Sequence, residues 1–172
     1  MKQVTISLTV NGKPVSRLAP ADISLADFLH EKLNLTGTKV SCGMGICKAC
    51  TIAVRQQDQN RLLRMQACIT PAAAVEGQQV LTVEGLSVRG TLTTAQKALL
   101  ENFSFQCGYC TPGFLMGITL LIDALLDKPV PRHMLDQAID EHLGQHICRC
   151  TGYANYRKAV LKILDETPGI LT

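Results

Sequence analysis

Tryptophan is absent from this 172-residue chain, and aromatic residues make up only 4% of it. This scarcity of aromatic rings argues against nucleic-acid binding by base stacking. Charge is also sparse, because charged residues make up 18% of the chain and the formal net charge is only +3. The basic residues are scattered rather than clustered, so we expect no nucleic-acid partner.

Long apolar runs are missing too. The longest nearly unbroken run, Gly113 to Ile122, is well short of the ~20 residues that span a bilayer. The first residues, Met1-Lys2-Gln3, lead straight into an alternating pattern, without the apolar segment and cleavage site of a secretory signal. We therefore expect a cytoplasmic protein with no membrane span.

Cysteine, by contrast, is plentiful, with eight residues. Structural disulfides are rare in a reducing cytosol, so this number indicates metal or redox chemistry. The sequence contains no nucleotide-binding glycine loop and no nucleophile elbow, and we expect no substrate-binding catalytic residues in it. The cysteines fall into two sets of four, Cys42, Cys47, Cys50 and Cys68 in the first half and Cys107, Cys110, Cys148 and Cys150 in the second.

The first half of the chain has the pattern of a small mixed sheet with one helix across it. Apolar and polar residues alternate on both sides of Asn11-Gly12, which predicts a β-hairpin with a type I′ turn. Ser24, with Asp27 three residues later, predicts the N-cap of a helix that Gly37 ends. The other predicted segments are a loop rich in Gly and Cys at 38–50, strands at 51–54, 63–69 and 79–83, and a polar hairpin tip at 55–60.

The second half changes to helical spacing. Thr93 or Thr94 predicts the cap of a helix that runs to about Phe103. These patterns predict an α+β chain in which a small helical bundle follows the sheet, with a domain boundary between Gly85 and Gly90. The further predicted helices are 112–126, 133–143 and 153–165.

The first cysteine set has the spacing of a plant-type [2Fe-2S] site. Cys42, Cys47 and Cys50 lie on one predicted loop, and Cys68 follows after seventeen residues. Glycines within the loop permit backbone N–H groups to turn towards the sulfurs. Zinc usually takes ligand pairs in two separated knuckles, so this spacing favours a cluster, and zinc remains the alternative.

The second cysteine set consists of a C-x2-C pair and a C-x-C pair. The last cysteine of each pair is followed by a threonine, Thr111 or Thr151, which we expect to cap the next helix. Two helix N-termini would then converge on one anionic centre. A zinc site with four thiolates matches this spacing as well as a cluster does.

The positions of the histidines argue against a site with mixed cysteine and histidine ligands, so we expect only cysteine ligands at both sites. A Rieske centre would place a histidine two residues after a cysteine, and no cysteine here has one there. His30, His133 and His142 fall on predicted helices, and we interpret them as polar-face residues. For His146 we expect a surface or packing role, although its place two residues before Cys148 leaves a tuning role open.

Three segments carry a more specific signal: Gly37-Thr38-Lys39 before the Cys42 loop, the run from Gln106 through Cys107-Gly108-Tyr109-Cys110 to Gly113, and Cys148-Arg149-Cys150-Thr151-Gly152-Tyr153. With them, nearly the whole chain resembles the small iron-sulfur subunit of the xanthine dehydrogenase and aldehyde oxidase family of molybdenum hydroxylases. The resemblance implies a β-grasp ferredoxin-like domain over residues 1–86. An all-α four-helix bundle over residues 87–172 would follow it, and each domain would hold one [2Fe-2S] cluster.

The resemblance also implies partners and residue roles. A large subunit would carry a molybdopterin cofactor, and a further subunit would carry FAD. The second cysteine set would hold the cluster nearer molybdenum, where Gln106 and the Cys150 sulfur approach the pterin, and the first set would hold the cluster facing the flavin. The protein would pass electrons from the molybdenum centre to a flavin or another acceptor. A free-standing iron-sulfur carrier and an interaction module with two zinc sites are the alternatives.

The first loop departs from the family pattern. Met44 stands where the family usually has Glu, and Lys48 stands where it usually has Gly. Both differences make the surroundings of the sulfurs less negative, and net charge near a cluster sets its potential. We therefore expect a more positive potential at the first site.

Overall fold

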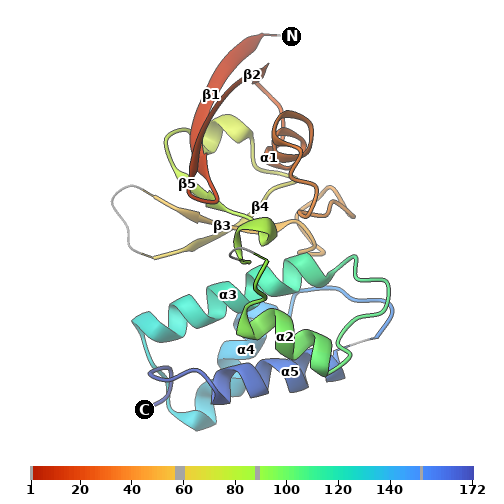
Figure 1. Cartoon of the computed structure of the whole chain (residues 1–172), viewed down its shortest axis with the longest axis vertical. Helices are drawn as coiled ribbons and strands as arrows, with labels where there is room; N and C mark the ends of the chain where they lie inside the picture. Colours follow the sequence, from red (N-terminus) through yellow and green to blue (C-terminus); the bar gives the residue numbers. More distant parts are fainter. Residues whose placement is uncertain (1, 57–60, 88–89, 152) are drawn as a thin grey trace.

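The computed structural model describes residues 2–56, 61–87, 90–151 and 153–172. A sheet domain built by the first half of the chain lies above a helical domain built by the second, and α3 faces the sheet (Figure 1). Met1, most of the predicted hairpin tip, part of the predicted boundary and Gly152 lie outside the described residues. Among the described residues, no helix combines the length and the apolar character that crossing a membrane requires.

In the sheet domain, the residues that the structure describes form a five-stranded mixed sheet, as predicted. Its strand order is β2-β1-β5-β3-β4, in which β1 and β5 are parallel and the other neighbours antiparallel. Asn11 and Gly12 both have positive φ, 51° and 77°, which confirms the type I′ turn. The strands are β1 (Gln3–Val10), β2 (Lys13–Pro20), β3 (Thr51–Arg55), β4 (Leu63–Gln66) and β5 (Gln79–Leu81).

One helical segment crosses the sheet, and its start is as predicted. The Ser24 hydroxyl accepts a hydrogen bond from the Asp27 N–H at 3.0 Å and caps α1 (Leu25–Asp27), which continues as a wider turn, η1 (Phe28–Lys32). The prediction that Gly37 ends this helix is wrong. Asn34, with φ of 56°, takes the left-handed conformation that follows the helix.

The described part of the helical domain contains four α-helices, also as predicted. Thr93 caps the first with a capping box, in which its side chain and that of Gln96 each accept the other's backbone N–H. The four helices bury a common apolar core separate from that of the sheet domain. They are α2 (Thr94–Glu101), α3 (Thr111–Asp127), α4 (Leu135–Leu143) and α5 (Ala154–Asp165).

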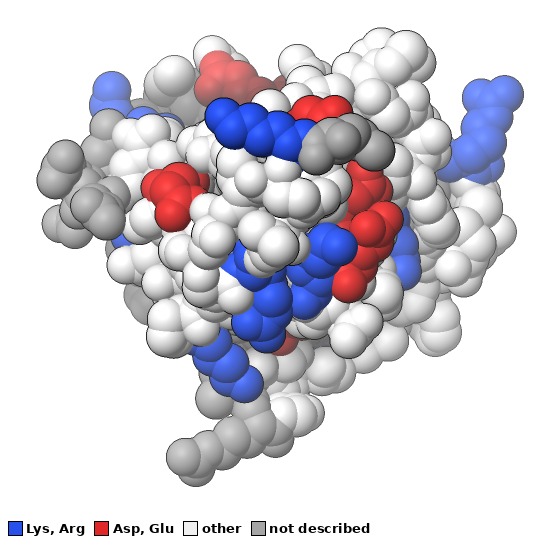
Figure 2. Space-filling view, turned by 90° about the horizontal axis from the view of Figure 1, so that it is seen from above, with Lys and Arg blue, Asp and Glu red and all other residues white. Residues whose placement is uncertain are grey.

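The face of the molecule seen from above carries charges of both signs. Several Lys and Arg side chains lie together near its centre, directly beside Asp and Glu (Figure 2). This agrees with the low net charge of the sequence.

The two domains meet along α3, which packs on β3. Met116 and Leu120 of α3 form a small buried cluster with Ala53 of β3. At the start of α3, Gly113 lies against residues 41–50, which we call the first cysteine loop. A Cβ on Gly113 would lie 2.4 Å from the Lys48 carbonyl oxygen, so only glycine permits this approach.

Replacement of Gly113 by alanine should force the first cysteine loop away from α3, because the obstructing Lys48 oxygen is backbone. We expect Gly113→Ala to lower the free energy of unfolding by about 1–3 kcal/mol, as overpacking does. Denaturant unfolding of the full chain measures this. Gly117→Ala, in the same helix, is the matched control, because the three heavy atoms nearest to its Cβ would belong to the side chains of Leu143 and His146 rather than to backbone. Equal losses from the two variants would contradict the argument.

Candidate iron-sulfur sites

Part of the first cysteine set depends on glycines in the first cysteine loop. Gly43 and Gly45 have φ of 65° and 70°, the left-handed region that favours glycine. The backbone N–H groups of Met44 and Cys47 point to the Cys42 sulfur, at N–Sγ distances of 3.4 and 3.5 Å. Hydrogen bonds from Cys47 and Met44 lower the pKa of the Cys42 thiol to about 6. The loop is therefore shaped to stabilise a thiolate.

Two adjacent strands bring together the rest of the first set. Cys50 directly precedes β3, and Cys68 follows shortly after the end of β4. Because β3 and β4 pair antiparallel, these two sulfurs lie 3.3 Å apart. Burial raises the pKa of the Cys50 thiol to about 12. The first set thus forms two sulfur pairs, Cys42 with Cys47 and Cys50 with Cys68.

The second cysteine set lies near the N-terminal ends of two helices, as expected. Cys110 directly precedes α3, and Cys150 lies shortly before α5. The sulfurs of Cys150 and Cys107 are 3.5 Å apart, and both residues are exposed. The Cys110 and Cys148 side chains are in hydrogen-bonding contact, and Cys148 is buried. The second set also forms two sulfur pairs.

Thr111 does not cap α3, contrary to the prediction. Cys110 occupies the N-cap position, and the Thr111 hydroxyl instead pairs with the Tyr156 hydroxyl at 2.8 Å. The Tyr156 hydroxyl oxygen also lies 3.6 Å from the Cys110 sulfur. The Tyr156 ring stacks on the Phe114 ring, with their centroids 3.9 Å apart. Burial raises the pKa of Cys110 to about 11 and also raises the pKa of Tyr156. The sequence does not predict this role for Tyr156, because nothing in the cysteine spacing distinguishes it from the other apolar-face residues of α5.

Thr151 does not cap α5 either, because Tyr153 occupies that position. The Thr151 hydroxyl lies 3.4 Å from the Cys148 sulfur and donates to the Ser104 carbonyl oxygen at 3.2 Å. Burial acts to raise the pKa of Cys148, but the contacts with the Thr151 hydroxyl and with the backbone N–H groups of Cys150 and Thr151 outweigh it. The pKa of Cys148 falls to about 7. The Thr151 hydroxyl therefore helps to lower the pKa of Cys148 and does not cap α5.

His146 is a core residue, with 2% of its surface exposed. Its Nε2 lies 3.0 Å from the Gly113 carbonyl oxygen, and its ring centroid lies 4.9 Å from that of Phe114. Burial lowers its pKa to about 4, so the ring is neutral at pH 7. The packing role is confirmed. His30 and His142 are half-buried and bonded to backbone carbonyls, so they are less exposed than polar-face residues.

Hydrogen bonds join the two cysteine sets directly. The Ile147 N–H, next to Cys148, donates to the Cys47 carbonyl oxygen at 3.1 Å. The Tyr109 hydroxyl, within the C-x2-C pair, donates to the Val40 carbonyl oxygen at 2.6 Å. Both contacts cross between the domains, and residue spacing along the chain could not reveal them.

The donor sets fit two binuclear clusters. A [2Fe-2S] cluster takes four cysteine thiolates, divided between its irons, and each set presents its sulfurs as two pairs. A structural zinc ion would gather four thiolates around a single centre. The pairing therefore favours a cluster in both sets, including the second, where spacing alone did not distinguish it from zinc.

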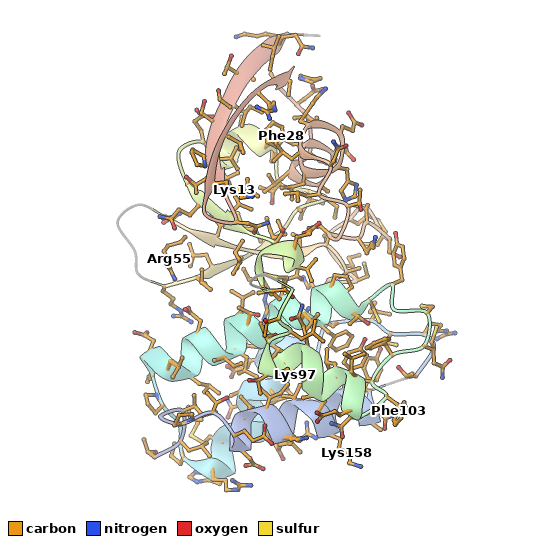
Figure 3. The ribbon with its side chains drawn as sticks, viewed as in Figure 1. Lys13, Phe28, Arg55, Lys97, Phe103 and Lys158 are labelled. Atoms are coloured by element: carbon orange, nitrogen blue, oxygen red, sulfur yellow. The ribbon has the colours of Figure 1, made fainter. Side chains whose placement is uncertain are left out.

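The surface beside each set differs in character. Met44, Ile46 and Ile69, beside the first set, are 65%, 59% and 56% exposed. Beside the second set, the exposed residues include Gln106 and Phe103. Phe103 lies just after α2, at the edge of the helical domain (Figure 3).

Comparison with known families matches both halves of the chain. A family described as "2Fe-2S iron-sulfur cluster binding domain" matches residues 8–82. A second family, described as "[2Fe-2S] binding domain", matches residues 82–161. The chain therefore contains two domains of the [2Fe-2S]-binding type.

Similar proteins span the whole chain. "Caffeine dehydrogenase subunit gamma" of Pseudomonas sp. (strain CBB1) is 38% identical over 97% of this chain and 95% of its own length. "Nicotine 6-hydroxylase small subunit" of Paenarthrobacter nicotinovorans is 38% identical over 97% of this chain and 91% of its own. In the crystal structure of quinoline 2-oxidoreductase from Pseudomonas putida 86, a chain that is 34% identical superposes with a TM-score of 0.80 over 99% of this chain and 94% of that one. Together with the two domain matches, these relatives show that the chain belongs to the molybdenum hydroxylase family, as its small electron-transfer subunit with two [2Fe-2S] domains.

Proposed function

We propose that all eight cysteines are cluster ligands, four to each cluster. The observation that carries this is the arrangement of each set as two sulfur pairs. When bound, each cluster supplies one-electron transfer. The ligands of the first cluster are Cys42, Cys47, Cys50 and Cys68, within residues 1–86, and those of the second are Cys107, Cys110, Cys148 and Cys150, within residues 87–172.

The chain's own residues position the two clusters and tune them. Backbone N–H groups turned inward by Gly43 and Gly45 stabilise negative sulfur at the first site. Hydroxyl groups of Thr151 and Tyr156 lie beside sulfurs at the second. The Ile147 hydrogen bond to the first cysteine loop holds the two sites at a fixed separation, as a one-electron relay requires.

We assign the second site to the partner that carries molybdopterin. Cys107 and Cys150 are exposed, with Gln106 exposed beside them, so a cofactor on another subunit can approach this sulfur pair closely. Phe103, which is 80% exposed, offers this partner an apolar anchor. This arrangement supports contact of Gln106 and the Cys150 sulfur with the pterin.

We assign the first site to a flavin-carrying partner. Met44, Ile46 and Ile69 form an apolar surface around the first cysteine loop, since Ile69 packs over Gly45. Scattered exposed apolar residues are ordinary, but three beside one redox site are typical of a docking surface. Electrons from the molybdenum partner would leave the chain here, to FAD or another acceptor.

Replacement of Cys150 by serine should remove or alter the second cluster and spare the first, because the two sets draw ligands from separate domains. Electron paramagnetic resonance of the reduced protein, with iron and sulfide analysis, measures this. The unaltered chain should bind about four iron and four sulfide, and Cys150→Ser about half of each. Cys42→Ser is the matched variant for the first site. Loss of both signals from either variant would argue against two independent sites, and zinc in place of iron would overturn the proposal.

Phe103→Gly should weaken binding of the molybdopterin subunit by about tenfold or more, a typical loss for an exposed aromatic anchor. Phe103 has φ of 48°, which glycine adopts without strain, so the isolated chain should remain as stable as before. Binding of the purified subunits measures the effect. Leu126→Ala removes another exposed side chain, 54% exposed and near the far end of α3, and serves as the control. Equal affinity of Phe103→Gly and the unaltered chain would contradict this assignment.

A further inference from the structure

Lys48 has an unusual backbone conformation inside the first cysteine loop. Its φ of 61° lies in the left-handed region, where a side chain other than Gly, Asn or Asp is uncommon. Its carbonyl oxygen accepts hydrogen bonds from the Thr51 N–H at 3.2 Å and the Thr51 hydroxyl at 2.7 Å. The same oxygen lies against Gly113 of α3. The backbone at Lys48 is therefore fixed from two sides.

The Lys48 ammonium is held over the same loop, where its Nζ donates to the Gly45 carbonyl oxygen at 2.9 Å. The ion pairs found among the described residues join other side chains, so none of those carboxylates neutralises Lys48. Burial, followed by the positive charges of Arg64 and Lys48, lowers the pKa of His146. Lys48 lies at the junction of the two cysteine sets, because the preceding Cys47 carbonyl oxygen accepts from the Ile147 N–H and the Lys48 carbonyl oxygen lies against Gly113.

A purely structural role does not account for lysine at this position. Glycine adopts a φ near 61° without steric cost, whereas a lysine side chain strains it. A single ammonium–carbonyl contact on a half-exposed loop stabilises a fold only slightly. Strain retained beside a functional site indicates that the side chain contributes to the chemistry there.

We propose that Lys48 is a potential-setting residue that raises the potential of the first cluster relative to that of the second. This rests on the proposed function, because it requires both clusters. Reduction adds one electron and no proton to a centre that is already negative. The fixed ammonium of Lys48 stabilises that added charge, so the potential of the first cluster rises. With both clusters bound, this difference would favour transfer of one electron from the second cluster, which would be oxidised, to the first, which would be reduced.

Redox titration of the cluster-loaded full chain, followed by electron paramagnetic resonance of both clusters, tests this. Lys48→Gly removes the charge and relieves the strained φ, so the variant should fold at least as well as the unaltered chain. Lys48→Asn is a second neutral variant, because asparagine tolerates the left-handed region. Lys48→Arg keeps the charge. Lys97→Gln removes a distant charge on α2, exposed on the helical domain (Figure 3).

Both neutral variants should shift the first cluster to a more negative potential and shift the second cluster less. Lys48→Arg and Lys97→Gln should leave the first potential where it was. An unchanged or more positive first potential in Lys48→Gly and Lys48→Asn, or equal shifts of both clusters, overturns the role of Lys48 while leaving the two-cluster function intact. Absence of two [2Fe-2S] signals from the unaltered chain would instead overturn the proposed function.

Discussion

Both sites depend on bringing thiols from separated segments into pairs. In the first site, the Cys50 and Cys68 sulfurs meet because β3 and β4 are neighbours in the sheet. In the second, Cys110 and Cys148 meet because two helices begin at the same end of the bundle. These two pairs therefore require their domains to be folded, and binding of a cluster in turn stabilises that fold. This reciprocity explains how domains of about 80 residues, a size at which a core is marginal, form stable units.

The separation between the sites is set by backbone rather than by side chains. The Ile147 N–H donates to the Cys47 carbonyl oxygen, and Gly113 lies against the Lys48 carbonyl oxygen. Contacts of this kind survive most side-chain substitutions, provided that position 113 remains glycine. A relay needs this constancy, because its two clusters must stay at a fixed separation.

Local sequence signals predicted what depends on near neighbours. The Asn11-Gly12 turn, the Ser24 cap and the Thr93 capping box each involve residues within a few positions, and the structure confirms all three. The predictions that Thr111 and Thr151 cap helices are wrong for one reason. Each hydroxyl bonds to a group that is distant in the sequence; Tyr156, for example, lies 45 residues from Thr111. The eight cysteines divide into two sets by spacing, but their pairing emerged only from tertiary structure.

The two sites present different hydrogen-bond surroundings to their sulfurs. The first relies on backbone N–H groups and carries a cation, Lys48, whereas hydroxyl groups contribute at the second. Hydrogen bonds to sulfur and local charge both set the potential of a cluster. A backbone donor is fixed by the fold, but a side-chain cation changes with one substitution. The potential difference between the sites is thus open to adjustment at position 48 without any change of ligand, cap or domain contact.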